Sequence, residues 1–410
     1  MTVPVAATYA QRIAFVCEIA ARLHRYGTTA QRLEATILAL AARLGLDCEP
    51  WSNPTGMILS FSDPKRTLGA SDTTRVLRLA PGENDLGKLV EADRIAEEVA
   101  AGQMSLADGH AALRRLDRAP GRGWQLRQVL AFGLASGGVA GLWRLPWLDL
   151  ATATLIGLGI GLLGRFTDRR PRLREAADAI ASMFAGGVAI LVASVIAPLN
   201  LNTVIIASLV VLLPGMMLTN AFNELTSQHW VSGTARFAGA LTTVVKLTVG
   251  SMIAVTLAQL LGFEPGVRAA RPQADAVEWG ALLVCAYAFA VLFKARRRDY
   301  GWAMGAAIAG YLIARYAGRA WGNEVGLFLS AMTMTAAGNG FARAFNRPGA
   351  LVRLPGIIML VPGSSSLRSL MDIVQGNAGD TTLRVVLQIL MALVAGLVFG
   401  NVLLPARKAL

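Results

Sequence analysis

Charged residues are scarce in this chain. Asp, Glu, Lys and Arg make up 16% of its 410 residues, whereas soluble globular domains carry about 25%. Hydrophobic residues supply 54% of the sequence. A single water-soluble domain is therefore excluded, and most of the chain is expected to lie in a lipid bilayer.

Cysteine is also rare, and Cys17, Cys48 and Cys285 stand far apart in the sequence. Their spacing matches no metal-binding or redox motif, so we expect three free thiols, no metal site and no cofactor. The first residues lack a basic segment followed by a short apolar run, and no cleavable signal peptide is expected. The first apolar span would direct the chain to the membrane.

The charge that is present is unevenly distributed. Residues 1–123 hold 15 of the 39 basic and 14 of the 26 acidic residues, so they are nearly neutral. The rest of the chain carries almost all of the net charge of +13, in short segments between apolar runs. This pattern is typical of the positive-inside rule. No basic stripe with interleaved aromatic residues occurs, so no nucleic-acid partner is expected.

Residues 1–123 are predicted to form a cytoplasmic α+β domain that ends in a linker. Apolar residues at helical spacing from Leu33 to Leu44 indicate an amphipathic helix. The motif Asn53-Pro-Thr-Gly56 indicates a turn between two strands. We expect, in order, two helices within 8–45 separated at 26–28, strands within 48–62, a strand at 75–80, and helices at 86–101 and 105–116.

Ten apolar spans follow this domain, and the predicted fold class is a mainly α, polytopic membrane protein. They are expected near 126–143, 147–164, 179–197, 201–219, 237–261, 279–293, 301–317, 325–342, 350–366 and 385–404. A full crossing needs about 20 residues. With the N-terminus inside, the cytoplasmic loops hold 15 basic residues and the opposite side seven. We therefore expect an inner-membrane protein with both termini in the cytoplasm.

A set of four polar and backbone-breaking residues recurs in the two halves of the membrane part. Pro214, Gly215, Glu224 and Arg236 are each followed 148 residues later by their counterparts Pro362, Gly363, Asp372 and Arg384. Five spans per half would make residues 124–262 and 263–410 an inverted repeat, with broken helices meeting at a central binding site. The simpler interpretation is that each Pro-Gly pair only ends a helix.

Several of these segments resemble the threonine/serine exporter family. The resemblance lies in WSNPTGMILS at 51–60, in LPGMMLTNAFNE at 213–224 followed by SGTAR at 232–236, and in VPGSSSLRSL at 361–370. It extends over residues 8–405, including Gly396 and Gly400 of the last span. It implies export of threonine and serine from the cytoplasm, driven by the proton gradient, with halves that are separate chains in some members fused here.

A small zwitterion needs two complementary contacts. Its carboxylate suits Arg and helix N-termini, and its ammonium group suits carbonyls, hydroxyls or a carboxylate. Unwound backbone after each Pro-Gly pair is expected to offer free N–H groups, and Asn339 is expected to mark a further helix break. The candidate substrate-binding residues are Pro214, Gly215, Thr219, Asn220, Asn223, Asn339, Pro362, Gly363, Ser364, Ser365 and Ser366.

Ionisable residues in or near apolar spans are the candidates for proton coupling, because such residues are costly in a membrane and usually functional. Glu224 and Asp372 are the proposed proton carriers, and Lys246 lies well inside an apolar span. Arg236 and Arg384 are their expected partners. The alternative is that both carboxylates sit in solvated loops and form ordinary ion pairs with these arginines.

Other classes of function stay open at this point. No sequence motif of a hydrolase, a metalloprotease or a nucleotide-binding loop occurs, so no enzyme is expected. A membrane-anchored enzyme or ligand sensor would use polar residues of the N-terminal domain, namely His24, Glu34, Asp47, Asn53, Thr55 and His110. A passive channel needs no carboxylate that changes protonation. The expected partners are the substrate, protons and the lipid bilayer, and a homo-oligomer is left open.

Overall fold

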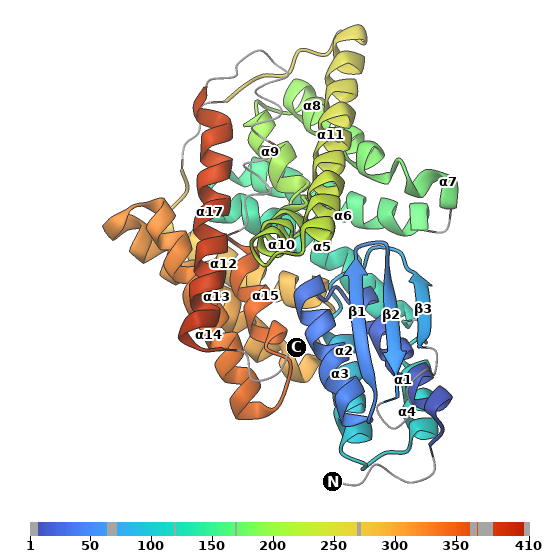
Figure 1. Ribbon diagram of the computed structural model, residues 1–410. Coiled ribbons are helices and arrows are strands. Elements are labelled where there is room, and N and C mark those ends of the chain that lie inside the picture. Colours follow the sequence, from blue (N-terminus) through green and yellow to red (C-terminus); the bar gives the residue numbers. More distant parts are fainter. Residues whose placement is uncertain are drawn as a thin grey trace.

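The computed structural model describes residues 7–63, 72–118, 120–168, 170–268, 272–360, 367 and 380–405. The chain is mainly helical, with 74% of residues in helices, and it contains one three-stranded antiparallel sheet in the order β1-β2-β3. Figure 1 shows this sheet, together with the helices near it in sequence, at one end of the molecule, and the longer helices of the rest of the chain beyond it.

The N-terminal part contains the helices and the hairpin at the positions that the sequence predicts. Its elements are α1 (Tyr9–Arg25), α2 (Ala30–Arg43), β1 (Asp47–Asn53), β2 (Gly56–Ser62), β3 (Thr73–Arg78), α3 (Leu86–Ala100) and α4 (Leu106–Arg115). Asn53 pairs with Gly56 across the predicted turn. The side chain of Ser105 accepts a hydrogen bond from the backbone of Asp108 and caps α4.

Alternating residues of β2 build the core of this part. Met57, Leu59 and Phe61 are buried on one face of the sheet, as the two-residue period of a strand requires. Helix α2 packs on β1, and it buries Leu33 and Ile37. The apolar spacing in the sequence therefore identifies the face of α2 that covers the sheet.

The rest of the chain forms the helical body. Its elements are α5 (Arg122–Leu142), α6 (Trp147–Asp168), α7 (Pro171–Arg174), α8 (Ala177–Val195), α9 (Leu201–Ser208), α10 (Gly215–Thr226), α11 (Trp230–Leu260), α12 (Asp275–Leu292), η1 (Arg297–Asp299), α13 (Tyr300–Trp321), α14 (Asn323–Phe345), α15 (Ala350–Ile358) and α17 (Asp380–Leu403). Five segments of the described chain are long and apolar enough to cross a membrane: α6, α8, α11, α12 and residues 384–403 of α17. Ten crossings stay a prediction.

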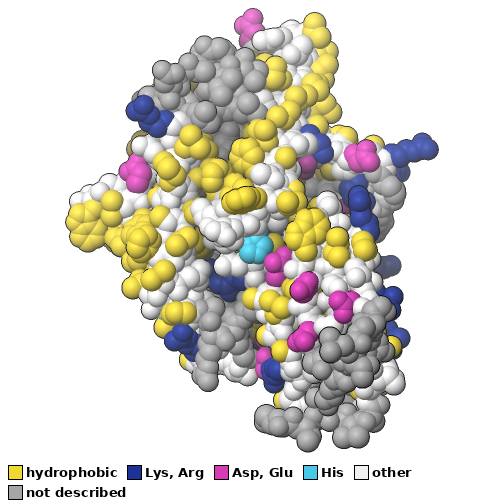
Figure 2. Space-filling model, viewed as in Figure 1, with side chains coloured by type: hydrophobic (Ala, Val, Ile, Leu, Met, Phe, Trp, Pro, Cys, Tyr) yellow, Lys and Arg dark blue, Asp and Glu magenta, His cyan; other side chains and the backbone are white. Residues whose placement is uncertain are grey.

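The outer surface of the helical body is strongly apolar. Phe237, Leu241, Val245, Val249 and Ile253 recur every four residues along α11, and each is at least 39% exposed. Figure 2 shows hydrophobic side chains over this body, while charged side chains gather nearer the sheet. An apolar stripe of this length is expensive in water and ordinary in lipid, so α11 faces the bilayer.

The predicted span 201–219 is interrupted at the Pro-Gly pair. Helix α9 ends at Ser208, and α10 begins at Gly215 with Pro214 as its N-cap residue. The expectation of unwound backbone after Pro214-Gly215 is wrong, because the non-helical residues 209–213 precede the pair and the helix resumes at Gly215. Ser136 donates its hydroxyl to the freed carbonyl of Ser208 at 3.0 Å. This freed carbonyl is thus satisfied inside the protein.

Two further predictions concern Asn339 and the second Pro-Gly pair. Helix α14 runs without interruption from Asn323 to Phe345, so the predicted helix break at Asn339 is wrong. Asn339 instead donates hydrogen bonds from within an intact helix. In the second half, α15 ends at Ile358, shortly before the second Pro-Gly pair. Pro362, Gly363, Ser364, Ser365, Ser366 and Asp372 lie outside the described residues.

Helices α13 and α15 approach so closely at Gly310 that no side chain fits there. A Cβ atom on Gly310 would lie 2.0 Å from the carbonyl oxygen of Gly356. We expect Gly310→Ala to lower the apparent melting temperature of the detergent-solubilised protein, because the clash is with backbone and overpacking costs about 1–3 kcal/mol. Melting is followed by size-exclusion chromatography after heating.

Gly305→Ala is the matched control on the same helix, since a Cβ atom there meets nothing within 4 Å. Removing a helical glycine stabilises by roughly 0.5–1 kcal/mol, so this variant should melt at or slightly above the wild-type temperature. Equal melting of the two variants would contradict the proposed close contact of α13 with α15.

Candidate functional site

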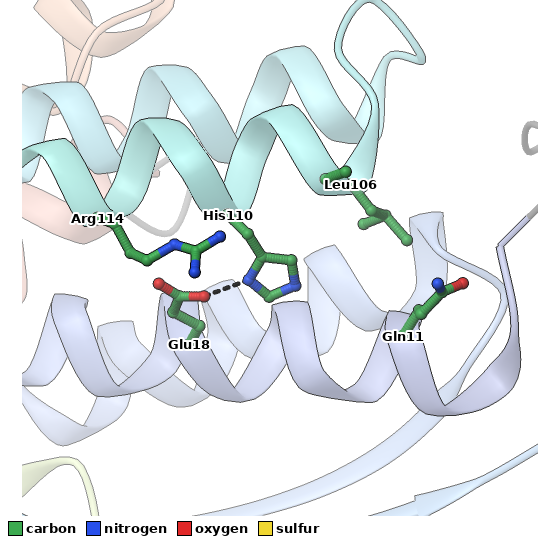
Figure 3. Close-up of a pocket in the computed structure, with 6 residues that line it drawn as sticks. Gln11, Glu18, Leu106, His110 and Arg114 are labelled. Carbon is green, nitrogen blue, oxygen red and sulfur yellow. Dashed lines mark hydrogen bonds and ion pairs between the residues drawn. The ribbon is translucent and has the colours of Figure 1, made fainter.

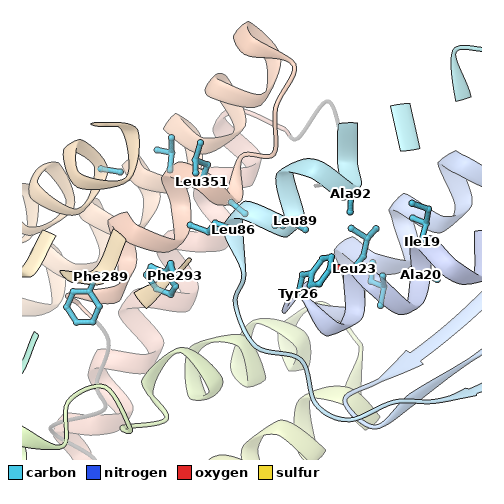
Figure 4. Packing of buried hydrophobic residues seen from close by; sticks show 14 of the residues in the cluster. Ile19, Ala20, Leu23, Tyr26, Leu86, Leu89, Ala92, Phe289, Phe293 and Leu351 are labelled. Atoms are coloured by element: carbon cyan, nitrogen blue, oxygen red, sulfur yellow. The ribbon is translucent and has the colours of Figure 1, made fainter. Parts of the chain in front are cut away.

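The N-terminal part contacts the helical body through the start of α3. The backbone N–H groups of Leu86 and Gly87 donate to the carbonyls of Phe293 and Lys294 at 2.9 and 3.1 Å. The free N–H groups at the start of α3 thus pair with carbonyl groups that directly follow the end of α12. Figure 4 shows Leu86 and Leu89 among the apolar side chains that link Phe293 and Leu351 to the core around Leu23.

The start of α2 contacts the helical body through Glu224 of α10. This carboxylate is fully buried, and its Oε1 accepts the backbone N–H of Ala30, the first residue of α2, at 2.9 Å. A carboxylate at a helix N-terminus is stabilised by the free N–H groups and by the helix dipole. Arg236 Nε lies 2.9 and 2.8 Å from the two carboxylate oxygens, and Ser232 donates at 2.7 Å.

Glu34, on the next turn of α2, extends this junction. Its Oε1 accepts the backbone N–H and the hydroxyl of Ser52 at 2.7 and 2.8 Å. Its Oε2 lies 3.1 Å from Nε2 of His229, which directly precedes α11. A chain of polar contacts therefore joins the sheet, α2 and the α10–α11 corner.

A small polar pocket lies beside this junction. It is lined by Thr29, Gln31 and Arg32 of the N-terminal part, by Met216, Thr219, Asn220 and Asn223 of α10, and by Thr335, Arg353, Leu354, Ile357, Leu397 and Asn401 of α14, α15 and α17. We call it the polar pocket. Its free volume is about 30 Å³, which holds only a few water molecules. The pocket is therefore too small for an amino acid in this conformation.

The described lining of the polar pocket holds two arginines and no acidic residue. Burial lowers the pKa of Arg32 to about 10, so its guanidinium still carries a full charge at neutral pH. Its Nη1 atom is buried, and no partner for it occurs in the described part of the chain. The hydroxyl of Thr335 is buried and equally without a partner among those residues. Such groups suit an anionic, hydrogen-bonding ligand.

The predicted residue Asn339 lies directly behind the pocket. Its side-chain nitrogen donates to Oδ1 of Asn401 at 2.9 Å and to the carbonyl of Leu404 at 2.7 Å. Asn401 itself lines the pocket. Asn339 is 2% exposed, so it positions a pocket residue from α14 rather than contributing to the lining.

The remaining predicted site residues have different surroundings. Thr219, Asn220 and Asn223 line the polar pocket, whereas Pro214 and Gly215 are buried at the start of α10. Lys246 donates to the carbonyl of Glu175 at 2.9 Å, away from the pocket. Glu224 and Arg236 form the buried pair at the start of α2, and Arg384 is exposed on α17. The suggestion of a solvated loop at Glu224 is wrong, because that side chain is fully buried.

Sequence reasoning missed the arginines of the pocket. Arg32 lies in the first turn of a predicted helix, where a cation is unfavourable, and Arg353 lies within the predicted span 350–366, where a charged residue is costly. In both cases a charged residue at an unfavourable position could have been recognised from the sequence. Gln31 and Asn401 carried no such signal, because polar residues at helix ends are common.

Buried carboxylates in the helical body were missed as well. Asp149 of α6 is fully buried and accepts hydrogen bonds from the backbone and side chain of Asn200, just before α9. Its second oxygen has no partner within the described part of the structure. Glu278 of α12 is 6% exposed and accepts the hydroxyl of Tyr311 at 2.7 Å, next to Arg315.

The polar residues that an enzyme or sensor would use lie in separate places. His110 contacts Glu18 between α1 and α4, beside Arg114, in a hollow of the surface (Figure 3). His24 contacts the carbonyl of Asn53 at 3.0 Å, and burial lowers its pKa. In the described residues, these histidines are thus tied into local contacts rather than gathered around one cavity.

These features together define a class of protein. Apolar helices face lipid, one predicted span is broken in the interior, and a small polar pocket lies beside the helix that follows the break, as in a membrane transporter. Residues 14–258 match one family model of the threonine/serine exporter, and residues 280–403 match a second model of the same family. The chain belongs to the threonine/serine exporter family.

Two curated proteins are similar over most of this chain. Pheromone-regulated membrane protein 10 of Zygosaccharomyces rouxii is 25% identical over 374 residues, which cover 88% of this chain and 37% of that protein. Uncharacterized protein C7D4.12c of Schizosaccharomyces pombe is 22% identical over 365 residues, which cover 86% of this chain and 47% of that protein. The chain thus spans less than half the length of either relative. No solved structure matches it significantly.

We expect Glu224→Gln to weaken the attachment of the N-terminal part. The amide cannot balance the charge of Arg236, and breaking a buried ion pair costs about 3–5 kcal/mol. Amide hydrogen exchange in full-length protein should therefore become faster at the start of α2.

Glu83→Gln is the control at the same interface. Glu83 pairs with Lys294 at 3.0 Å, but its side chain is 82% exposed, and such pairs contribute about 0–1 kcal/mol. Exchange at α2 should stay unchanged in this variant. If Glu224→Gln also left the exchange unchanged, the carboxylate would not hold the two parts together.

Proposed function

We propose that the chain exports threonine and serine from the cytoplasm and that the polar pocket is its substrate site. The observation that carries this proposal is the pocket lining. Thr219, Asn220 and Asn223, predicted to bind substrate, line one cavity together with two arginines. That cavity lies between the N-terminal part and the helix that follows the break at Pro214.

The lining suits a small hydroxylated amino acid. An arginine binds the carboxylate through paired, charge-assisted hydrogen bonds. Amide side chains such as Asn220 and Asn223 recognise a hydroxyl group. The first-turn N–H groups of α10, behind Pro214 and Gly215, add positive potential. We propose that Pro362, Gly363, Ser364, Ser365 and Ser366 contribute the equivalent surface from the second half.

Alternating access through an inverted 5+5 repeat is the proposed mechanism. Corresponding helices support it, because α9 and α15 start at Leu201 and Ala350, and α11 and α17 start at Trp230 and Asp380. The pairs α8–α11 and α14–α17 are both packed together. The polar pocket draws on both halves. We propose residues 1–123 as the cytoplasmic domain, and 124–262 and 263–410 as the repeats.

The small volume of the pocket indicates a conformation that cannot hold the substrate. Threonine is larger than the few water molecules that fit, so loading requires movement. The N-terminal domain contributes Thr29, Gln31 and Arg32 to the lining, and its displacement would open the pocket to the cytoplasm. Such gating by a moving element is common among proteins that enclose their ligands.

Proton antiport is the proposed energy source. Protonating Glu224 would remove the charge that holds Arg236 and the start of α2, so proton uptake there would loosen the closed junction. Asp372 and Arg384 are proposed to do the same in the second half, with Lys246 as a further charge on α11. Asp149 is an additional carrier candidate, because it is fully buried and its Oδ1 has no partner among the described residues.

The proposed orientation places both termini in the cytoplasm of a cell with an inner membrane. The N-terminal domain contacts basic residues of the segment between α12 and α13, where Lys294 pairs with Glu83 and Arg296 with Glu91. Basic loops mark the cytoplasmic side. Domain and loop therefore belong on the same side of the membrane.

Transport in proteoliposomes tests the function. We expect radiolabelled threonine to move through the purified protein, faster when an opposing proton gradient is imposed. Asn223→Ala should lower the initial rate at least fivefold through loss of a pocket contact, whereas Gln259→Ala, exposed at the end of α11, should not. A flux that ignores the proton gradient would favour a passive channel, and no flux above empty vesicles would contradict export of threonine.

A further inference from the structure

We propose that Arg32 of the N-terminal domain binds the carboxylate of the transported substrate, so that this domain contributes a residue to the transport site. The proposal rests on the proposed function, because it takes the polar pocket as the substrate site. It goes further in assigning one contact to a residue outside the membrane helices.

The position of Arg32 is unfavourable without an anion. It is the third residue of α2, which starts at Ala30, and the positive end of the helix dipole repels a cation there. Glu224 stabilises the start of α2 by accepting the N–H of Ala30, but it forms no ion pair with Arg32. No ion pair joins Arg32 to a carboxylate of the described chain.

Arg32 is partly buried, and the shielding of one of its nitrogens makes this missing partner significant. One terminal nitrogen of Arg32, Nη1, is shielded from solvent and lacks a hydrogen-bond partner among the described residues. Desolvation lowers the pKa of Arg32 only to about 10, so the group stays charged at neutral pH. A buried charge is normally paired, and the polar pocket is the open space beside it.

The other lining residues favour a carboxylate as the partner. Arg353 of α15 adds a second cation, and the unpartnered hydroxyl of Thr335 adds a donor and acceptor. A planar guanidinium matches the two oxygens of a carboxylate. Asn220 and Asn223 on α10 are then left for the remaining polar groups of the substrate.

This arrangement makes substrate binding depend on the docked position of the N-terminal domain. Arg32 and Ala30 share the first turn of α2, and Glu224 of α10 holds that turn at 2.9 Å. A carboxylate between Arg32 and the membrane helices would add a second connection between the two parts. Bound substrate should therefore favour the closed junction.

Ligand binding to the full-length protein in detergent tests the assignment, with L-threonine and L-threoninamide as probes. Threoninamide keeps the hydroxyl and the amine but lacks the carboxylate. We expect the wild type to bind threonine at least tenfold more tightly than threoninamide. Arg32→Gln should weaken threonine binding at least tenfold and leave threoninamide binding unchanged, and Arg32→Lys should give an intermediate affinity.

Arg43→Gln is the matched control on the same helix. Arg43 pairs with Glu97, and its side chain is 43% exposed, so this variant should bind both probes as the wild type does. Wild-type threonine affinity in Arg32→Gln would overturn the proposal. If Arg32→Gln is too unstable for binding measurements, Arg32→Lys is measured in its place. Wild-type affinity for threonine in Arg32→Lys, together with an unchanged preference for threonine over threoninamide, would also overturn the proposal.

Two further measurements separate this proposal from the export function. The first is the binding of sodium propionate, which carries a carboxylate but no amine or hydroxyl. If propionate binding requires Arg32 but the protein does not transport threonine, the carboxylate site would be supported and threonine export contradicted. Normal threonine transport by Arg32→Gln would contradict the carboxylate site and leave export intact. Inorganic phosphate that displaces threonine more effectively than propionate does would identify a phosphate site and overturn the assignment.

Discussion

The first N–H groups of a helix have no partners within that helix, and this constraint decides how the two parts of the molecule meet. The membrane part supplies the missing acceptors at two places. Glu224 accepts the N–H of Ala30 at the start of α2, and the carbonyls of Phe293 and Lys294 accept those at the start of α3. Backbone geometry therefore sets the docked position, and apolar contacts around Leu86 fill the space beside it.

The polar pocket is a consequence of this docking. The same turn of α2 that Glu224 holds carries Arg32 to the pocket beside α10. Pro214 ends the unwound stretch and starts α10, which places Thr219 and Asn223 on the other wall. A cation buried without a carboxylate is costly. The unpaired charge of Arg32 is placed where an anionic ligand can balance it.

Local signals predicted much of the fold and part of the site. The hairpin at Asn53–Gly56 and the helices predicted at 86–101 and 105–116 follow from residues within a few positions of each other, whereas α10 starts where unwound backbone was expected. The break at Asn339 was a wrong prediction, because flanking glycines are compatible with an intact helix whose neighbours approach closely. Glu224 was singled out from the sequence as a proton carrier, which stays a prediction. Its contact with Ala30 joins residues 194 positions apart, and no local pattern reports such a pair.

The sequence by itself determined the environment of the chain and the nature of its elements. Hydropathy and helical periodicity are properties of short segments, and they act wherever the segment lies. Only the tertiary structure decided that Arg32 would face Arg353 and the asparagines of α10 across one pocket, and that Glu224 would hold a helix of the N-terminal domain. Those relations arise when helices distant in sequence pack together, because packing selects which polar groups lose their water and must find partners in each other.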